Sequence, residues 1–227
     1  MTCRACGNSA ALIRLWEADG FGWWRCPTCG CDTSTATYTD IAAQYQTADY
    51  CRAFGIADPE RATEECATNV RYFEQHADPA LPRTFLDVGC NEGSMMVAMR
   101  RAGWETAGFD VNPHAAGEGV TISSEFRADM FPRQFGAVNS REVIEHLEDW
   151  RGHLRELAAA CLPGGLVQVQ TPRPIERPDP NPYQRAHLVL LTPDMLDAAL
   201  RQVGLTPIDR HTWGTGQLHV AKALATA

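Results

Sequence analysis

The amino-acid sequence predicts an α/β fold: a doubly wound, mainly parallel sheet, preceded by a small cysteine-rich module. Two observations support this prediction. Residues 84–113 contain a short apolar strand, a glycine-bracketed turn, an apolar-periodic helix and a second strand, which together form one β-turn-α-β unit. Residues 1–31 contain two closely spaced cysteine pairs. Such pairs are typical of a metal-stabilised module that is too small for a core of its own.

Length and composition are those of an ordinary globular protein. The chain has 227 residues, 44% of them apolar and 21% charged, which suffices for one full domain and a small extra one. No run approaches ~20 apolar residues and no signal-like segment opens the chain, so we expect no membrane span and a cytoplasmic location. A formal charge of −8 disfavours a nucleic-acid partner, because phosphate contacts need clustered cations. The sequence leaves the oligomeric state open.

The cysteine pairs have the spacing of a structural zinc site. Each pair is a C-x-x-C-G knuckle, and 19 residues separate the two. Two knuckles place four thiolates around one tetrahedral ion. Between them, Ala11–Trp16 and Phe21–Arg25 flank a predicted hairpin turn. Residues 1–31 therefore resemble a zinc ribbon. The predicted zinc ligands are Cys3, Cys6, Cys26 and Cys29.

Two alternatives concern these thiols. A redox dithiol needs only one C-x-x-C at a helix start, so two knuckles favour zinc. Cys31 is one thiol too many for four-coordinate zinc. It could replace Cys29 as a ligand, although a spare thiol is the simpler interpretation.

Residues 32–79 are predicted to form a helical linker or lid. Candidate helices cover Tyr38–Phe54 and Pro59–His76, and Asp58 is a good N-cap for the second of them. The apolar face of the second helix is expected to pack against the sheet.

The turn within residues 84–113 has the features of a nucleoside site. Gly89 and Gly93 lack a Cβ, so a ligand can lie against their backbone. Asp110 ends the next strand, where an acid accepts hydrogen bonds from ribose hydroxyls. A dinucleotide fingerprint needs G-x-G-x-x-G, and here Asn91 and Ser94 occupy the second and third glycine positions. NAD is therefore disfavoured.

With Asp87 two residues before the first glycine, this turn resembles motif I of class I S-adenosylmethionine-dependent methyltransferases. The resemblance implies a Rossmann-like sheet of seven strands over residues 80–227, with the turn facing the methionine part of the cofactor. Asn91 replaces the usual middle glycine, a mild departure because asparagine tolerates positive φ. The implied cofactor residues, among them an acid for the adenine amino group at position 129, are Asp87, Gly89, Cys90, Asn91, Gly93, Asp110, Val111, Asp129, Met130 and Ser140.

In this family the segment before motif I often forms a lid over the cofactor. Tyr45 and Tyr50 are candidates for that role, and simple packing is the equal alternative.

A run of acidic and imidazole groups follows the predicted strand Gly136–Ser140. If a helix begins near Ser140, then Glu142, Glu145 and His146 lie at i, i+3 and i+4 and share one face. That face lies at the carboxyl end of the sheet, where open α/β sheets bind ligands.

The run E-V-I-E-H-L resembles the motif after the fourth strand in ubiquinone-pathway O-methyltransferases and in small-RNA 2′-O-methyltransferases. In the latter, two glutamates, the adjoining histidine and a later histidine bind a divalent cation that holds two neighbouring substrate hydroxyls. His187 follows the predicted fifth strand as that later histidine does. Carboxylates with imidazole suit Mg²⁺, Mn²⁺ or Fe²⁺. The implied catalytic and second-metal residues are Glu142, Glu145, His146 and His187.

The metal is not the only interpretation of these groups. A cation would lower the pKa of a bound hydroxyl, whereas without metal His146 or His187 would act as a general base. In a purely structural interpretation, Glu142 and Glu145 stabilise a helix start and His146 packs behind them.

The remaining chain is predicted to complete the fold. A proline-rich connection, residues 171–182, lies on the substrate side. Arg173, Arg177 and Arg185 are candidates to contact an anionic substrate, although a solvated loop is the default. The other predicted elements are a helix over Asp149–Cys161, a strand over Leu166–Gln170, a helix over Thr192–Gly204 and strands over Pro207–Thr212 and Gln217–Ala223.

The resemblance implies methyl transfer from S-adenosylmethionine to a hydroxyl of a small molecule, a sugar or a phenol with adjacent hydroxyls. One alternative is that the ribbon recognises RNA or protein. Three Arg against one Glu and one Asp in residues 1–31 argue against a phosphate-binding surface. Another alternative is a non-catalytic module that binds the cofactor and docks through the ribbon, which would leave the Glu-Glu-His group without a role.

Overall fold

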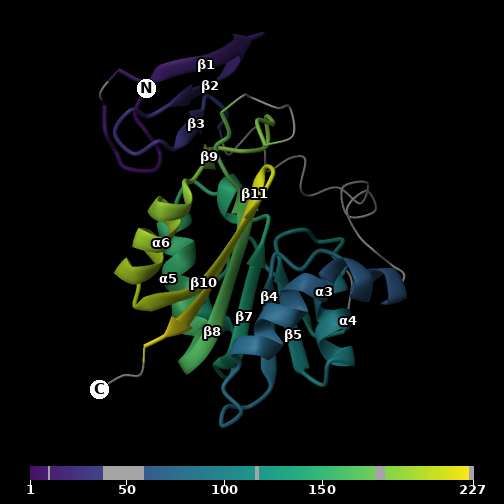
Figure 1. Cartoon of the computed structure of the whole chain (residues 1–227). Helices are drawn as coiled ribbons and strands as arrows, with labels where there is room; N and C mark the ends of the chain where they lie inside the picture. The colour runs from purple at the N-terminus through teal and green to yellow at the C-terminus, as the bar shows by residue number, and fades with distance from the viewer. Residues whose placement is uncertain (10, 38–58, 116–117, 177–181, 225–227) are drawn as a thin grey trace.

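Two β-sheets organise the chain (Figure 1). The computed structural model describes residues 1–9, 11–37, 59–115, 118–176 and 182–224. A seven-stranded sheet forms the main body, and a four-stranded sheet lies at one end of it, beside the N-terminus. The predicted fold class is confirmed. The predicted helix Tyr38–Phe54, with Tyr45 and Tyr50, lies outside the described residues.

The large sheet has the order β10-β11-β8-β7-β4-β5-β6. Strands β6, β5, β4, β7 and β8 are parallel, whereas β11 and β10 run antiparallel to their neighbours. The chain leaves β4 toward one edge and returns through β7 toward the other, so the strand order reverses between β4 and β7. Ligands bind at the carboxyl ends of strands beside such a reversal. The strands are β4 (Thr84–Val88), β5 (Glu105–Asp110), β6 (Val120–Ile122), β7 (Phe135–Arg141), β8 (Cys161–Pro172), β10 (Leu205–Trp213) and β11 (Gly216–Ala223).

Helices cover both faces of this sheet (Figure 1). Alternation along β4 shows why: Phe85 packs in the core beneath α3 and α4, and Leu86 packs in the core beneath α5 and α6. The helices are α3 (Pro59–His76), α4 (Ser94–Arg101), α5 (Trp150–Ala160) and α6 (Pro193–Gln202), with short 3₁₀ turns η1 (Ala128–Met130) and η2 (Ile144–His146). In the described part of the chain, none of the helices has the length and apolar character needed to cross a membrane.

The small sheet has the order β1-β2-β3-β9. The predicted hairpin is present, and it turns at Asp19 and Gly20, whose φ values of 52° and 74° are those of a two-residue hairpin turn. The other two strands of the small sheet were not predicted. Residues from Asp32 were expected to be helical, but three of them pair with β2 on one side, and two of these three also pair with β9 on the other. The strands are β1 (Ile13–Ala18), β2 (Phe21–Arg25), β3 (Asp32–Ser34) and β9 (Val189–Leu190).

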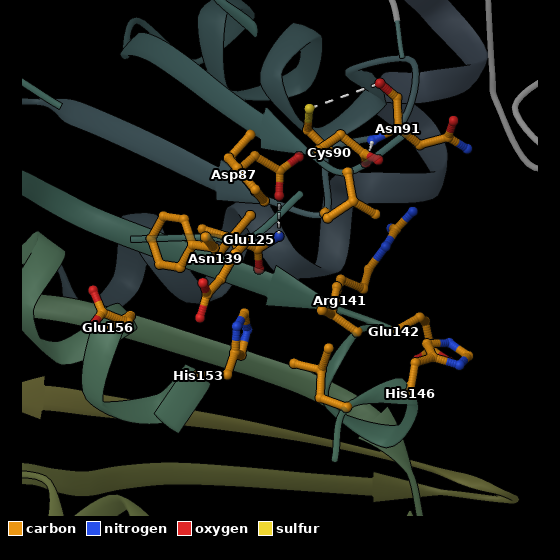
Figure 2. A pocket seen from close by; sticks show the side chains of 18 of the residues that line it. Asp87, Cys90, Asn91, Glu125, Asn139, Arg141, Glu142, His146, His153 and Glu156 are labelled. Atoms are coloured by element: carbon orange, nitrogen blue, oxygen red, sulfur yellow. Dashed lines mark hydrogen bonds between the residues drawn. The ribbon is translucent and has the colours of Figure 1, made fainter. Parts of the chain in front are cut away.

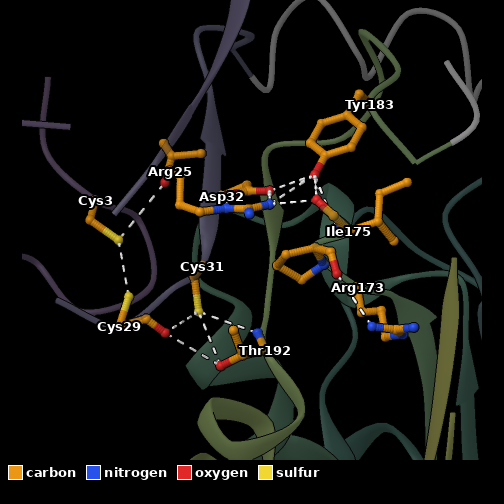
Figure 3. Close-up of polar contacts among 11 residues, drawn as sticks. Cys3, Arg25, Cys29, Cys31, Asp32, Arg173, Ile175, Tyr183 and Thr192 are labelled. Carbon is orange, nitrogen blue, oxygen red and sulfur yellow. Dashed lines mark hydrogen bonds and ion pairs between the residues drawn. The ribbon is translucent and has the colours of Figure 1, made fainter. Parts of the chain in front are cut away.

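A buried charge cluster joins the small sheet to the main body (Figure 3). Asp32 is fully buried and accepts hydrogen bonds from Nε and Nη2 of Arg25 at 2.8 and 2.9 Å. The Tyr183 hydroxyl, which follows β8 in the chain, donates to the same carboxylate at 2.6 Å. Because every partner is supplied, this buried charge stabilises one arrangement of the two sheets rather than opposing it. Trp150, at the start of α5, adds a hydrogen bond to the Arg4 carbonyl at 3.1 Å.

Candidate active site

A cavity of about 620 Å³ opens at the carboxyl ends of β4, β5 and β7 (Figure 2). This is the edge of the sheet at which the strand order reverses, and the volume is that of a typical small-molecule site. Of the residues predicted to bind a cofactor, six line it: Asp87, Gly89, Cys90, Asn91, Asp110 and Val111.

The turn after β4 forms one wall through its backbone. Gly89 has φ 82°, and a Cβ there would come within 2.3 Å of a Val143 methyl carbon, so this position requires glycine. Asn91 has φ 47°, the left-handed conformation that asparagine was expected to tolerate. Gly93, with φ 80°, is the N-cap residue of α4 and lies behind the wall.

Asp110 is held rigidly at the end of β5. One carboxylate oxygen accepts a hydrogen bond from the backbone N–H of Asn91 at 2.7 Å, and the other accepts one from the backbone N–H of Asn112 at 2.8 Å. Burial raises the pKa of this carboxyl, and the two amides oppose that shift. Each oxygen retains a further lone pair, so a pair of ligand hydroxyls can bind there.

Asp87 and Asn139 lie side by side on the neighbouring strands β4 and β7. The side-chain NH₂ of Asn139 donates to the Asp87 carboxylate at 2.8 Å. The side-chain oxygen of Asn139 is buried without a hydrogen-bond partner among the described residues. Burial raises the pKa of Asp87 to about 6. This end of the cavity therefore presents two acceptor groups to a ligand that carries N–H donors.

An aromatic wall closes the opposite end, and sequence reasoning did not find it. Phe126 packs edge-on against His153, with ring centroids 6.0 Å apart. His153 is buried, which lowers its pKa to about 4, and its Nε2 lies 2.9 Å from the Ser140 hydroxyl. Ser140, predicted to touch cofactor, thus stands behind this wall. A flat ligand such as a purine can pack against such a wall.

Two residues predicted to bind the cofactor, Asp129 at the adenine and Met130, do not line the cavity in the structure. The Asp129 side chain is 71% exposed and pairs with Arg127 at 3.2 Å. Both Asp129 and Met130 lie in η1, outside the cavity, because this turn directs the carboxylate to solvent and the methionine toward the core. Glu125 and Phe126, just before the turn, line the cavity instead.

The predicted helix start near Ser140 is also wrong. Strand β7 continues to Arg141, and Glu142 then takes φ 55°, which reverses the chain before η2. The Glu142 amide donates to the Gln170 carbonyl at 2.9 Å and ties this reversal to β8. An i, i+3, i+4 helix face therefore does not exist here.

Three of the four predicted acidic and imidazole groups nevertheless meet. Ligand atoms of Glu145, His146 and His187 all lie within 4.8 Å of one another. Backbone contacts hold them together, since the Leu188 amide donates to the Glu145 carbonyl at 2.7 Å. Glu142 lies outside this set but lines the cavity together with His146. His146 thus belongs both to the cavity and to the three-residue cluster, which we call the Glu-His-His cluster.

The two histidines of this cluster are neutral and oriented. Nδ1 of His146 bonds to the Ala186 carbonyl at 2.8 Å, and Nδ1 of His187 bonds to the Pro182 carbonyl at 2.7 Å. A carbonyl only accepts, so both Nδ1 atoms carry the protons, and His146 has a further backbone hydrogen bond, to Glu142. Burial lowers the pKa of His146 to about 4 and of His187 to about 3.

Glu145 supplies the carboxylate of the Glu-His-His cluster. Glu145 is buried; one oxygen accepts the Thr171 hydroxyl at 2.8 Å, and the other has no hydrogen-bond partner in the described part of the chain. Burial, followed by repulsion from Glu145, raises the pKa of Glu142, and burial raises that of Glu145 as well. A carboxylate oxygen without a hydrogen-bond partner, grouped with two imidazole rings, fits a divalent cation.

The four predicted zinc ligands also meet. Sγ atoms of Cys3 and Cys29 lie 3.7 Å apart, as do those of Cys6 and Cys26. Zinc–sulfur bonds of about 2.3 Å in a tetrahedron require sulfurs about 3.8 Å apart, so the set fits zinc. Cys31 lies outside it and accepts the Thr192 amide at 3.3 Å (Figure 3), as expected of the spare thiol.

Of the arginines proposed for an anionic substrate, the two that the structure describes, Arg173 and Arg185, do not line the cavity. Arg173 bonds to the Gly214 carbonyl at 2.9 Å, in the turn between β10 and β11, and Arg185 stacks over Phe21 at 5.0 Å. Arg177 lies outside the described residues.

Comparison with known proteins agrees with this geometry. A family model described as a methyltransferase domain matches residues 59–209. Ubiquinone biosynthesis O-methyltransferase of Erwinia tasmaniensis is 32% identical over 113 residues, 44% of this chain and 46% of that protein. The enzyme of the same name from Ruegeria pomeroyi is 32% identical over 155 residues, 55% of this chain and 60% of that protein. The chain thus spans about half the length of the curated relatives it matches.

Solved structures share the fold at low identity. Magnesium protoporphyrin IX methyltransferase from Synechocystis with bound S-adenosylhomocysteine has a TM-score of 0.61 at 13% identity, covering 82% of this chain and 100% of that chain. The 1,6-didemethyltoxoflavin-N1-methyltransferase from Burkholderia thailandensis has a TM-score of 0.59 at 14% identity, covering 93% and 99%. The family match and the seven-stranded sheet lead to one conclusion: the chain belongs to the class I S-adenosylmethionine-dependent methyltransferases.

Proposed function

We propose that this protein transfers the methyl group of S-adenosylmethionine to a hydroxyl of a small molecule with adjacent hydroxyls, such as a phenol or a sugar. The observation that carries the proposal is the Glu-His-His cluster, which shares His146 with the cavity. The names of the relatives, ubiquinone biosynthesis O-methyltransferases, support O-methylation of a small hydroxylated molecule.

The cofactor end of the cavity is suited to an adenosine. In our proposal Asp110 accepts hydrogen bonds from the ribose hydroxyls, and the adenine packs against the wall of Phe126 and His153. The turn after β4 faces the methionine moiety. S-Adenosylmethionine supplies the electrophilic methyl group. The backbone of Gly89 and Asn91 excludes water from that side, because no side chain separates it from the ligand.

The acceptor is proposed to bind beside Glu142 and His146, with its hydroxyls toward the cluster. Glu145, His146 and His187 would hold a divalent cation such as Mg²⁺, Mn²⁺ or Fe²⁺, and Glu142 would be the fourth group. A divalent cation lowers the pKa of a hydroxyl bound to it, so an oxygen nucleophile becomes available at neutral pH.

The histidine pKa values favour the metal over a histidine base. A general base works best with a pKa near the working pH. Burial depresses the pKa of His146 to about 4 and that of His187 to about 3, which makes each a weak base but leaves each a neutral ligand. The carboxylates, whose pKa values are raised, would receive the acceptor proton if no cation is present.

We further propose that the four cysteines bind one structural zinc and that the chain has three parts: a zinc ribbon at residues 1–31, a linker or lid at residues 32–79 and a methyltransferase domain at residues 80–227. Strand β3 extends the sheet of the ribbon beyond residue 31. The paired sulfur distances of 3.7 Å support the zinc.

The test combines cofactor binding with methylation of catechol and of phenol, with and without Mg²⁺ or Mn²⁺ after chelation. We expect the wild type to bind S-adenosylhomocysteine and to methylate catechol in preference to phenol, in a metal-dependent manner. Glu145→Gln should reduce turnover by about 100-fold or more while it retains cofactor binding. Cys31→Ser, outside both clusters, is the control.

Two outcomes would contradict parts of this proposal. Full activity after chelation would exclude the cation and return the role of base to the carboxylates or histidines. Failure of the wild type to bind S-adenosylhomocysteine would overturn the cofactor assignment itself.

A further inference from the structure

The side chain of Arg141 lines the cavity but has no role in the proposed methyl transfer. Arg141 ends β7 and is half-buried. Figure 2 shows its side chain extending toward the turn that carries Asn91 and away from His153. The other arginine in the lining, Arg155, is exposed and pairs with Asp149 at 3.4 Å.

The guanidinium of Arg141 has an incomplete set of partners. Its Nη1 lies 3.6 Å from Sγ of Cys66 in α3, and sulfur is a weak acceptor. Among the described residues, no carboxylate forms an ion pair with Arg141 within 4.0 Å. Five N–H donors in a planar fork beside a ligand cavity are suited to a carboxylate from outside the chain.

Two hydrogen-bond acceptors, which favour a positively charged ligand group, lie on the same face of the sheet as Arg141. Asp87 and Asn139 are directly paired across β4 and β7, and Arg141 follows Asn139 by two residues, so all three side chains leave the sheet on one side. The carboxylate of Asp87 and the unpartnered oxygen of Asn139 are acceptors, suited to an ammonium group. Together with Arg141 they complement an ammonium and a carboxylate on one ligand.

Such a pair of charges is the amino-acid end of the cofactor. We propose that Arg141 binds the carboxylate of the methionine moiety while Asp87 and Asn139 bind its ammonium. The inference rests on the proposed cofactor site and adds the residue that recognises the carboxylate. Asp110 at the other side of the turn fixes the direction, because an adenosine held there points its sulfur end toward Asp87 and Arg141.

The test compares two ligands that differ in the amino-acid end. S-Adenosylhomocysteine has it, and 5′-methylthioadenosine keeps the adenosine and the sulfur but lacks it. Calorimetry on Arg141→Gln should show S-adenosylhomocysteine bound roughly 10- to 100-fold more weakly, because a charge-assisted hydrogen bond is lost, and 5′-methylthioadenosine bound as by the wild type. Arg141→Lys should recover part of the loss. Arg155→Gln, a matched arginine in the same lining, should change neither affinity.

Four other outcomes would each overturn the inference. Unchanged affinity of Arg141→Gln for S-adenosylhomocysteine overturns the inference while the cofactor site stands. Equal losses for both ligands overturn it too, because the guanidinium then supports the whole cavity. If only methylation of 3,4-dihydroxybenzoate falls, and not that of catechol, Arg141 recognises an acceptor carboxylate instead. Failure of the wild type to bind either ligand removes the proposed function as well.

Discussion

Asp110 is the single side chain on which the ribose end of the cavity depends. Its two oxygens are oriented by the amides of Asn91 and Asn112. Asp110→Asn places an N–H₂ group against one of these donors, so we expect affinity for S-adenosylhomocysteine to fall about 10-fold or more, measured by calorimetry. Asp129→Asn is the control, because that carboxylate is exposed and outside the cavity. A comparable loss in the control would contradict our assignment.

His153 makes the stability of the protein depend on pH. Its pKa is lowered to about 4 by burial, against an ordinary value of 6.5. The unfolded chain therefore takes up a proton that the folded chain excludes, and stability is lost as pH falls from about 6.5 to about 4. His153→Gln removes this contribution. We expect the free energy of unfolding of the wild type, relative to the variant, to fall by about 3 kcal/mol across that range. Denaturant unfolding at several pH values measures it, and parallel curves would refute it.

Predictions for single residues succeeded where the backbone conformation allows only one residue type. Gly89 was predicted from the absence of a Cβ, and its φ of 82° and close approach to Val143 explain why. The exposed position of Asp129 was not predicted, since a resemblance in letters carries no information on which way a 3₁₀ turn directs its side chain. Phe126 and His153 were missed because the chain separates them widely, and only packing across the cavity joins them.

At the scale of elements, the two knuckles are expected to depend on metal. Cys29→Ser removes a ligand of the proposed zinc, whereas Cys31→Ser removes a thiol outside the set. About one zinc per chain should be present in the wild type and in Cys31→Ser, and it should be lost or weakly held in Cys29→Ser, whose melting temperature should fall. Metal analysis and thermal unfolding test this. Zinc loss in Cys31→Ser alone would reassign the fourth ligand.

The ribbon should also influence the Glu-His-His cluster. The Ser34 hydroxyl, in β3, donates to the carbonyl of His187 at 2.7 Å, and the next residue, Leu188, donates its amide to Glu145 at 2.7 Å. We therefore expect Mn²⁺ affinity of the cluster, followed by electron paramagnetic resonance, to be weaker in Cys29→Ser than in Cys31→Ser. Equal affinities would show that the knuckle and the cluster are independent.

Elements with a strong periodic pattern were predictable. The helix Pro59–His76 was predicted with the bounds that the structure has, because its N-terminal proline and apolar face are local signals. Strands β3 and β9 were not, since three and two residues carry no period and are specified by partners far along the chain. The reversal at Glu142 was missed because a non-glycine residue with positive φ has no clear sequence signal.

For the whole molecule, the cluster of Arg25, Asp32 and Tyr183 predicts that the ribbon and the main body unfold together. Tyr183→Phe leaves the Asp32 carboxylate buried with one donor fewer. We expect a loss of about 1.5–3 kcal/mol in the free energy of unfolding, within a single transition in urea. Tyr72→Phe, which removes a hydroxyl from an outer helix, should change little. Two separate transitions in the wild type would contradict this coupling.

The overall architecture was accessible from the sequence, and the relation between its parts was not. Alternating strands and helices with a motif I turn predicted the seven-stranded sheet. The sequence predicted the ribbon, residues 1–31, as a separate module, because the strands that join it to the main body, β3 and β9, lie outside those residues. That joining depends on Asp32, a charged residue whose burial only its partners make tolerable.

The pairing of β3 with β9 also bears on how the chain is made. Asp32 pairs with Leu190, so the N-terminal sheet cannot close until the ribosome has released most of the polypeptide. Domains generally fold from the N-terminus as they emerge. Here the cysteine knuckles can capture their ion before β9 is made, whereas β3 beside them must wait, with an open edge, until residues 189 and 190 have been added. The small sheet, although most of it precedes the main body in the chain, is thus completed only after most of that body has been made.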